Sequence, residues 1–281
     1  MTNLILGAIC DLNINQIDKW IESTKEHFKG VIILLDYGST DEVKQYIKDQ
    51  GIVSYTIKHD HFGKQVEKFN PNTGQVSVTD SYTLVHNSRF FHTYQLIADS
   101  IGKYKYVFLT DVRDVYLQGD PIKWLDTNLG DKLLVFASEG LTFENEPWGK
   151  DTFLKNFGPY FYREVANETI YNVGVVGGYA EALKDFALFN YLLGIGHQVA
   201  DQVGMNLMLK TVWFDKVKKA KSEEGLAIHC GTFMDKTKPE NIKQLNEPEP
   251  YIKDKEVYTH DGKKYIFVHQ YDRIPELNVN K

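Results

Sequence analysis

The sequence is short of cysteine, of long apolar runs and of positive charge. Its two cysteines, Cys10 and Cys230, lie too far apart for a C-x-x-C motif, and we expect both to be buried, reduced thiols. No run approaches the roughly 18 apolar residues of a membrane span, and the N-terminus lacks the basic region of a signal peptide. A formal net charge of -6 disfavours nucleic acid and anionic membranes as partners. We therefore expect a cytoplasmic protein without a membrane span.

Several catalytic motifs are also missing from the sequence. H-E-x-x-H, G-x-x-x-x-G-K-[ST] and G-x-G-x-x-G do not occur, and no Ser/His/Asp or Cys/His spacing is evident. The hydrophobic content of 42% is nevertheless enough for a substantial core. Because there is no internal repeat and no Pro-rich linker, we expect a single domain over residues 1–281.

Apolar runs and amphipathic stretches alternate in the first third of the chain. Leu4–Ile9, Val31–Leu35 and Ile52–Ile57 are typical of buried strands, and helical spacing begins at Ile14 and again after a turn at residues 38–42. We expect Ser39 to cap the second of these helices in a capping box. Strand–helix alternation predicts an α/β fold with a mostly parallel central sheet flanked by helices.

The remaining elements are predicted with more turns between them. A polar stretch over Lys58–Thr79 is expected to be a loop or an excursion from the sheet. The Asp261-Gly262 dipeptide favours a hairpin that joins residues 256–260 to 264–269. The other expected elements are a helix over Tyr82–Ile101, a strand over Tyr104–Thr110, a helix near Pro121–Leu129, a strand over Leu133–Ala137, and helices near Thr152–Val165, Ala180–Gly194 and Gln202–Leu209.

Acidic residues follow two of the expected strands. Asp111 and Asp114 come directly after Tyr104–Thr110, and Asp36 follows the second strand. Ligands of open α/β sheets bind beyond the carboxyl ends of the strands, where carboxylates can hold a divalent cation. The alternatives are a surface turn with an Arg113 salt bridge, and a turn-forming role for Asp36.

Further candidates lie in the expected helices and in a small-residue strand. Arg89 could neutralise a phosphate, or it could be an exposed helix arginine. Asn172 precedes a run of small residues, which lets backbone approach a ligand closely, and Asp201-Gln202 opens a helix that Asp201 could simply cap. His229 and His269 each end an apolar run, where a neutral imidazole could ligate a metal.

Taken in order, these segments resemble the GT-A glycosyltransferases. Leu109-Thr110-Asp111-Val112-Arg113-Asp114 looks like a variant of their metal-site motif, and Tyr171–Val175 with Asp201-Gln202 is similar to motifs of the glycogenin-like retaining enzymes. Val268-His269-Gln270-Tyr271 is similar to their C-terminal metal-ligand segment. The resemblance implies a Rossmann-like sheet with a smaller acceptor-side subregion. It places the nucleotide-sugar half at about 1–118 and the acceptor-side half at about 119–281.

The resemblance also implies a set of functional residues. Asp111, Asp114 and His269 would hold a divalent cation, Mn²⁺ or alternatively Mg²⁺. Asp111, Asn172, Asp201 and Gln202 would act in catalysis, and Ala8, Cys10, Asp36, Arg89 and Arg113 would bind the nucleotide-sugar donor. The chain departs from the usual D-x-D motif at Arg113. Positions three apart on an extended strand face opposite sides, so Asp111 and Asp114 share one cation only if the chain turns between them.

Together, these expectations predict a hexosyltransferase. It would use a nucleoside diphosphate sugar, by resemblance a UDP-sugar, and a carbohydrate or protein-linked hydroxyl acceptor, with retention of configuration. One alternative is a non-catalytic module that binds sugar nucleotides or glycans. A nucleotidyltransferase is less favoured, because Cys10-Asp11-Leu12-Asn13-Ile14 stands where those enzymes usually carry a Gly-rich basic loop.

Overall fold

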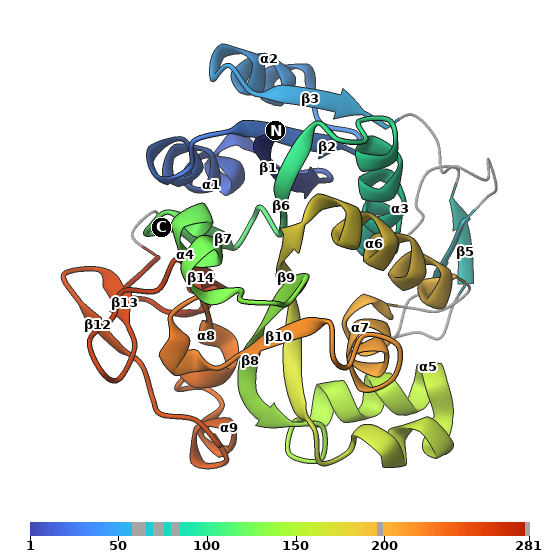
Figure 1. Cartoon of the computed structure of the whole chain (residues 1–281), viewed down its shortest axis with the longest axis vertical. Helices are drawn as coiled ribbons and strands as arrows, with labels where there is room; N and C mark the ends of the chain where they lie inside the picture. The colour runs from blue at the N-terminus through green and yellow to red at the C-terminus, as the bar shows by residue number, and fades with distance from the viewer. Residues whose placement is uncertain (58–65, 70–75, 80–84, 196–198, 279–281) are drawn as a thin grey trace.

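The computed structural model describes residues 1–57, 66–69, 76–79, 85–195 and 199–278. Its centre is a seven-stranded sheet with the order β10-β8-β9-β6-β1-β2-β3 (Figure 1). The strands are β1 (Thr2–Ile9), β2 (Val31–Asp36), β3 (Val53–Thr56), β6 (Tyr104–Thr110), β8 (Leu134–Thr142), β9 (Thr169–Tyr179) and β10 (Val217–Ala220).

The sheet is mixed but mostly parallel. β6, β1, β2 and β3 are parallel to one another, and β10 is parallel to β8. β9 runs antiparallel to both β6 and β8, and so joins the two parallel parts. The predicted α/β class and the predicted parallel arrangement of the first strands are confirmed.

Helices cover both faces of this sheet. The helices are α1 (Ile14–His27), α2 (Asp41–Asp49), α3 (Val85–Ala98), α4 (Pro121–Asn128), α5 (Pro147–Val165), α6 (Ala180–Gly194), α7 (Asp201–Lys210), α8 (Cys230–Phe233) and α9 (Pro239–Lys243), with short 3-10 turns η1 (Ser222–Glu224) and η2 (Tyr271–Arg273). Among the described residues, none of these helices has the length and apolarity needed to cross a bilayer.

Strand β1 is buried on both faces of the sheet. Leu4 and Leu6 pack in the core that contains residues of α3, α6 and α7, whereas Ile5 and Ile9 pack in the core that contains residues of α1 and α2. Successive side chains of a strand point to opposite faces, so a strand buried on both faces must be apolar throughout. The continuous apolar run in the sequence therefore corresponds to a central strand.

A smaller, three-stranded sheet lies beside the first. It has the order β11-β14-β7, formed by β11 (Ala227–His229), β14 (Phe267–His269) and β7 (Val115–Leu117). β14 is parallel to β11 and antiparallel to β7. Since β7 follows β6 after only a short turn, this sheet brings the C-terminal segment to the end of β6.

The predicted C-terminal hairpin forms only at its turn. The Thr259 N–H donates to the Lys263 carbonyl at 2.8 Å, and an isolated antiparallel bridge pairs Tyr258 with Lys264. Away from this turn the prediction is wrong, because β13 (Glu256–Tyr258) pairs with the preceding strand β12 (Tyr251–Lys253), while β14 joins the small sheet. The turn between β12 and β13 lies at Asp254 and Lys255, which both have positive φ, as a type I′ turn requires.

The predicted cap of α2 is displaced by one residue. Thr40, not Ser39, is the N-cap, and its side chain accepts a hydrogen bond from the Val43 N–H. The reason is Asp36, whose Oδ1 accepts the backbone N–H of Ser39 at 2.7 Å and so holds Ser39 in the preceding turn.

Two further expectations need adjustment. In the polar stretch that we expected over Lys58–Thr79, the described part forms strands β4 (Val66–Phe69) and β5 (Val76–Thr79), which pair antiparallel. The rest of this stretch, residues 58–65 and 70–75, lies outside the described residues. The predicted helix start at Tyr82 also lies outside them. Cys230 is buried as expected, whereas Cys10 is only partly buried.

Candidate functional site

The acidic segment after β6 forms a turn that brings both aspartates to one side. β6 ends at Thr110 and β7 begins at Val115, so the chain reverses between Asp111 and Asp114. The Asp111 N–H donates to the Gly174 carbonyl at 2.8 Å, and the Asp114 carbonyl accepts the Gln270 N–H at 2.7 Å. These bonds tie the turn to β9 and to the segment after β14.

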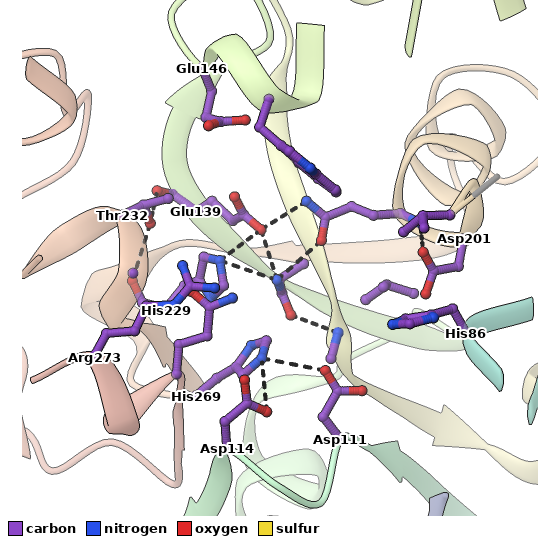
Figure 2. A pocket seen from close by; sticks show the side chains of 18 of the residues that line it. His86, Asp111, Asp114, Glu139, Glu146, Asp201, His229, Thr232, His269 and Arg273 are labelled. Carbon is purple, nitrogen blue, oxygen red and sulfur yellow. Dashed lines mark hydrogen bonds and ion pairs between the residues drawn. The ribbon is translucent and has the colours of Figure 1, made fainter. Parts of the chain in front are cut away.

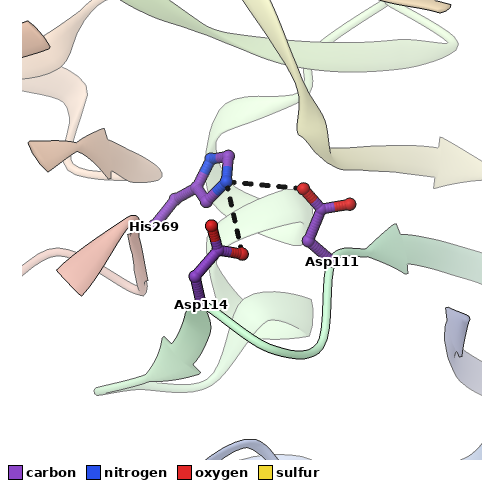
Figure 3. A group of neighbouring side chains, drawn as sticks. All are labelled: Asp111, Asp114 and His269. Carbon is purple, nitrogen blue, oxygen red and sulfur yellow. Dashed lines mark ion pairs between the residues drawn. The ribbon is translucent and has the colours of Figure 1, made fainter. Parts of the chain in front are cut away.

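His269 completes this group (Figure 3). It stands opposite Val115 in the pairing of β14 with β7. Its Nε2 lies 3.4 Å from Asp111 Oδ2 and 3.7 Å from Asp114 Oδ1. One potential ligand atom from each of the three side chains lies within 4.8 Å of the other two. Two carboxylates and an imidazole form a donor set that suits a divalent cation such as Mn²⁺.

The charges of the group depend on one another. Burial opposes ionisation of Asp111, yet the Arg89 guanidinium and His269 hold the pKa of Asp111 well below its usual range. Burial raises the pKa of Asp114. Burial also disfavours the charged form of His269, but Asp114 and Asp111 outweigh it and raise the pKa of His269. The two carboxylates therefore favour a positive charge beside them, which either a proton on His269 or a bound cation can supply.

Arg89 is buried between two carboxylates. Its Nη1 donates to Asp111 Oδ1, and its Nη2 donates to Asp201 Oδ2 at 3.1 Å. The side chain of Arg89 is 6% exposed. The reading of Arg89 as an exposed helix arginine is therefore wrong. Asp201 accepts from the Arg89 guanidinium and does not cap α7, because the N-cap is Ala200. The predicted contact of Arg89 with a diphosphate stays a prediction.

A second buried carboxylate, Glu139 of β8, organises the centre of the site (Figure 2). Its Oε1 accepts hydrogen bonds from Asn172 Nδ2 at 2.7 Å and Gln202 Nε2 at 3.0 Å, and lies 3.1 Å from His229 Nε2. Asn172 Nδ2 also donates to Gln202 Oε1 at 3.1 Å. Because a carboxylate only accepts, Glu139 fixes which way both amides point.

The same contacts set the ionisation of this centre. Burial opposes the charge of Glu139, but His229 and the hydrogen bonds to its carboxylate hold the pKa of Glu139 well below its usual range. Burial lowers the pKa of His229. We therefore expect an ionised Glu139 that accepts the Nε2–H of a neutral His229 near pH 7.

The backbone of Gly174 lies so close to the side chains of His269 and Asp111 that no larger residue fits there. A Cβ atom at this position would lie 2.4 Å from His269 Cε1 and 2.8 Å from Asp111 Oδ2. The small residues of β9 thus allow the strand to pass directly behind the Asp111–Asp114–His269 group, as expected for a strand that approaches a ligand.

One cavity of about 350 Å³ contains both centres. Seven of the predicted site residues line it: Arg89, Asp111, Asp114, Asn172, Asp201, Gln202 and His269. Ala8, Cys10, Asp36 and Arg113 do not. Asp36 is buried and accepts the N–H groups of its own turn, and the half-exposed Arg113 forms an ion pair with Asp272 at 3.5 Å.

Several lining residues were not predicted, including Glu139, Glu146, Trp148 and Arg273. Glu139 follows an apolar run that we took to end at Ala137, although β8 continues through Thr142. A glutamate inside a buried strand is the signal that could have marked it. His229 was a candidate metal ligand from the sequence, but it lies outside the Asp111–Asp114–His269 group and contacts Glu139 instead, which is far away in the sequence.

Comparison with known proteins identifies the fold. No protein-family model matches the chain, and no curated protein matches it in sequence. The apo structure of the WbbM bifunctional glycosyltransferase superposes with a TM-score of 0.55 at 12% identity, over 95% of this chain and 45% of that chain. Apo mouse xyloside xylosyltransferase 1 superposes with a TM-score of 0.53 at 11% identity, over 95% of this chain and 96% of that chain.

These likenesses establish the architecture. The chain has the α/β fold of GT-A glycosyltransferases, with a mixed, mostly parallel seven-stranded sheet flanked by helices. This chain spans less than half the length of the WbbM structure that it matches.

Proposed function

We propose that this protein is a metal-assisted glycosyltransferase that transfers a hexosyl group from a nucleoside diphosphate sugar, most favourably a UDP-sugar, to a hydroxyl acceptor. The observation that carries the proposal is the Asp111–Asp114–His269 group, which stands at the carboxyl end of β6 inside a cavity of a GT-A fold. This end of an α/β sheet is where ligands usually bind.

The three side chains fit a divalent cation by their chemistry and spacing. Asp111 would remain an ionised ligand at neutral pH because Arg89 and His269 lower its pKa. A bound cation would supply positive charge next to the diphosphate leaving group. Arg89 contributes its own charge less directly, since Asp111 and Asp201 already neutralise it.

Asn172, Asp201 and Gln202 would orient the transferred sugar and the acceptor. The amides of Asn172 and Gln202 are locked by Glu139, so they are positioned without a loss of side-chain freedom on binding. Both N–H groups of Asn172 are already donated, to Glu139 and Gln202, so Asn172 would act as an acceptor through Oδ1. The resemblance to glycogenin-like enzymes favours transfer with retention, which NMR of the first-formed product would test.

The test is release of UDP from UDP-sugars, measured with Mn²⁺ or with chelator, for the wild type and for Asp111→Asn, Asp114→Asn and His269→Ala. We expect turnover that needs Mn²⁺ and is abolished in Asp111→Asn. Asp126→Asn is the matched control, because Asp126 pairs with Lys105 on the surface outside the cavity.

The possible results separate the rival readings. Full turnover in chelator would refute metal assistance and leave Arg89, which lines the cavity, as the candidate for stabilising the diphosphate. Tight binding of a UDP-sugar without release of UDP would indicate a binding module. Calorimetry that finds no uridine diphosphate species bound, but another nucleotide bound tightly, would refute the choice of donor.

A further inference from the structure

The cavity extends well beyond the Asp111–Asp114–His269 group. Figure 2 shows Glu146 on the opposite side of the cavity from Asp111 and Asp114, with Glu139 and His229 between them. Trp148 and Lys238 also line this cavity. If the diphosphate lies next to Asp111 and Asp114, as the proposed function requires, the Glu146 end is left for the acceptor.

Trp148 is an unusual residue in this protein. Its exposed fraction is 50%, whereas Trp20, Trp124 and Trp213 are exposed by 7% or less. Exposing a large indole costs free energy unless a ligand covers it, and this indole lies at a cavity and not on a remote surface. A half-exposed tryptophan in a cavity is therefore a candidate contact for a flat, weakly polar ligand face.

The start of α5 holds Trp148 in place. Glu146 is the N-cap of this helix, and its Oε2 accepts the Gly149 N–H at 2.5 Å. Pro147 occupies the first helical position, where its fixed φ suits the helix. Trp148 thus projects from a capped first turn, and a rigid element makes a more precise binding surface than a loop does.

Carboxylates supply the polar partners around this indole. The Glu139 side chain contacts Asn172, Gln202 and His229 through Oε1 alone, so within the described residues Oε2 has no side-chain partner and can accept a ligand hydroxyl. Burial raises the pKa of Glu146, whose carboxyl group lines the same cavity. The ionised Glu139 would repel an anionic ligand beside it, although two cations, Lys238 and Arg273, also line the cavity.

We propose that Glu139, Glu146 and Trp148 form an acceptor subsite for a neutral pyranose ring. A pyranose has an apolar face of C–H groups that can stack on the indole and equatorial hydroxyls that can donate to carboxylates. This inference deepens the proposed function and relies on it for the position of the donor.

The first experiment measures acceptor binding without turnover. Acrylamide quenching of tryptophan fluorescence reports mainly on Trp148, because the other three tryptophans are buried. The protein is saturated with UDP and Mn²⁺, and methyl glycosides of glucose, galactose, mannose and xylose are added. We expect at least one of them to lower the quenching constant by about half, while the methyl glycoside of glucuronic acid and a serine-containing peptide leave it unchanged.

The second experiment separates acceptor from donor effects. Trp148→Ala should raise the acceptor KM about tenfold, equivalent to about 1.4 kcal/mol, and leave hydrolysis of the UDP-sugar within twofold of wild type. Trp148→Phe should restore most of the affinity because it keeps an aromatic face. The matched control is Tyr160→Ala, since Tyr160 is an exposed aromatic residue that lies past the break of α5 at Gly158 and does not line the cavity.

The experiments distinguish a failure of the acceptor subsite from a failure of the proposed function. If UDP-sugar is bound and hydrolysed but no neutral glycoside protects Trp148, or the glucuronide or the peptide protects it instead, the acceptor subsite is overturned and the donor assignment stands. An unchanged acceptor KM in Trp148→Ala would also overturn it. If no UDP species binds at all, the proposed function itself fails.

Discussion

Replacing Arg89 with alanine should destabilise this protein severely. The guanidinium is buried and bonded to both Asp111 and Asp201, and the side chains of Arg89 and Asp201 are 6% and 5% exposed. Removing one partner of a buried ion pair typically costs about 3–5 kcal/mol, because the remaining charge is left without compensation. From the sequence we had expected Arg89 to face the cleft and the fold to tolerate its removal.

The cost can be measured as a change in the free energy of unfolding. Urea denaturation at pH 7 in chelator should show a loss of about 3–5 kcal/mol for Arg89→Ala. At roughly 2–4 °C for each kcal/mol in a large domain, Tm should fall by about 6–20 °C. Arg89→Lys, which retains a charge but not the two-pronged geometry, should lose less.

A double variant tests the cause. Arg89→Ala combined with Asp201→Asn removes one of the uncompensated carboxylates, so it should be more stable than Arg89→Ala alone. A loss below about 1 kcal/mol in Arg89→Ala would refute the argument, since it would place this guanidinium among exposed, weakly coupled charges. A double variant that is no more stable than the single variant would equally refute it.

Three further outcomes are expected. Gly174→Ala should weaken Mn²⁺ binding at least about tenfold in calorimetry, because a Cβ there would lie 2.4 Å from His269 Cε1; an unchanged Kd would contradict the packing argument. Glu139→Gln should lower the free energy of unfolding by about 1–2 kcal/mol at pH 7, since charge-assisted hydrogen bonds become neutral ones. The pKa of Glu139 is lower in the folded chain than in the unfolded chain. The wild type should therefore exceed Glu139→Gln in free energy of unfolding by the full amount above a pH of about 4.3, and this excess should disappear as pH falls through the folded pKa. An excess that stays constant down to a pH of about 2 would count against an ionised Glu139.

The central strands were predictable because one physical cause dominates them. β1, β2 and β6 are buried on both faces, so their apolar runs are continuous and need no partner to be recognised. The tail was not predictable in this way. Asp261-Gly262 is a local turn signal, but β14 gains more by pairing with β11 and β7, which lie far away in the sequence.

The site likewise has residues that could be predicted from the local sequence and residues that could not. Asp111 and Asp114 follow a strand end, and a turn of the kind we required does join them. The contact between Arg89 and Asp201 spans 112 positions, and that between Glu139 and His229 also joins distant segments. Such pairs are produced by the packing of α3 against α7 and of β8 against β11, and no spacing rule along one chain reveals them.

The three-stranded sheet has a consequence for how the site opens. Asp111 ends a strand of the large sheet, whereas His269 belongs to the small sheet. The small sheet has a cluster of its own around Ile228, Tyr265 and Val268, while Ala227 and Phe267 pack into the core of the large sheet. Different parts of a protein open at different free energies, and core strands open last. A cation held by residues of both sheets would add a link between them to this shared core, so it should slow amide hydrogen exchange in β11 and β14 more than in the central strands β1 and β2.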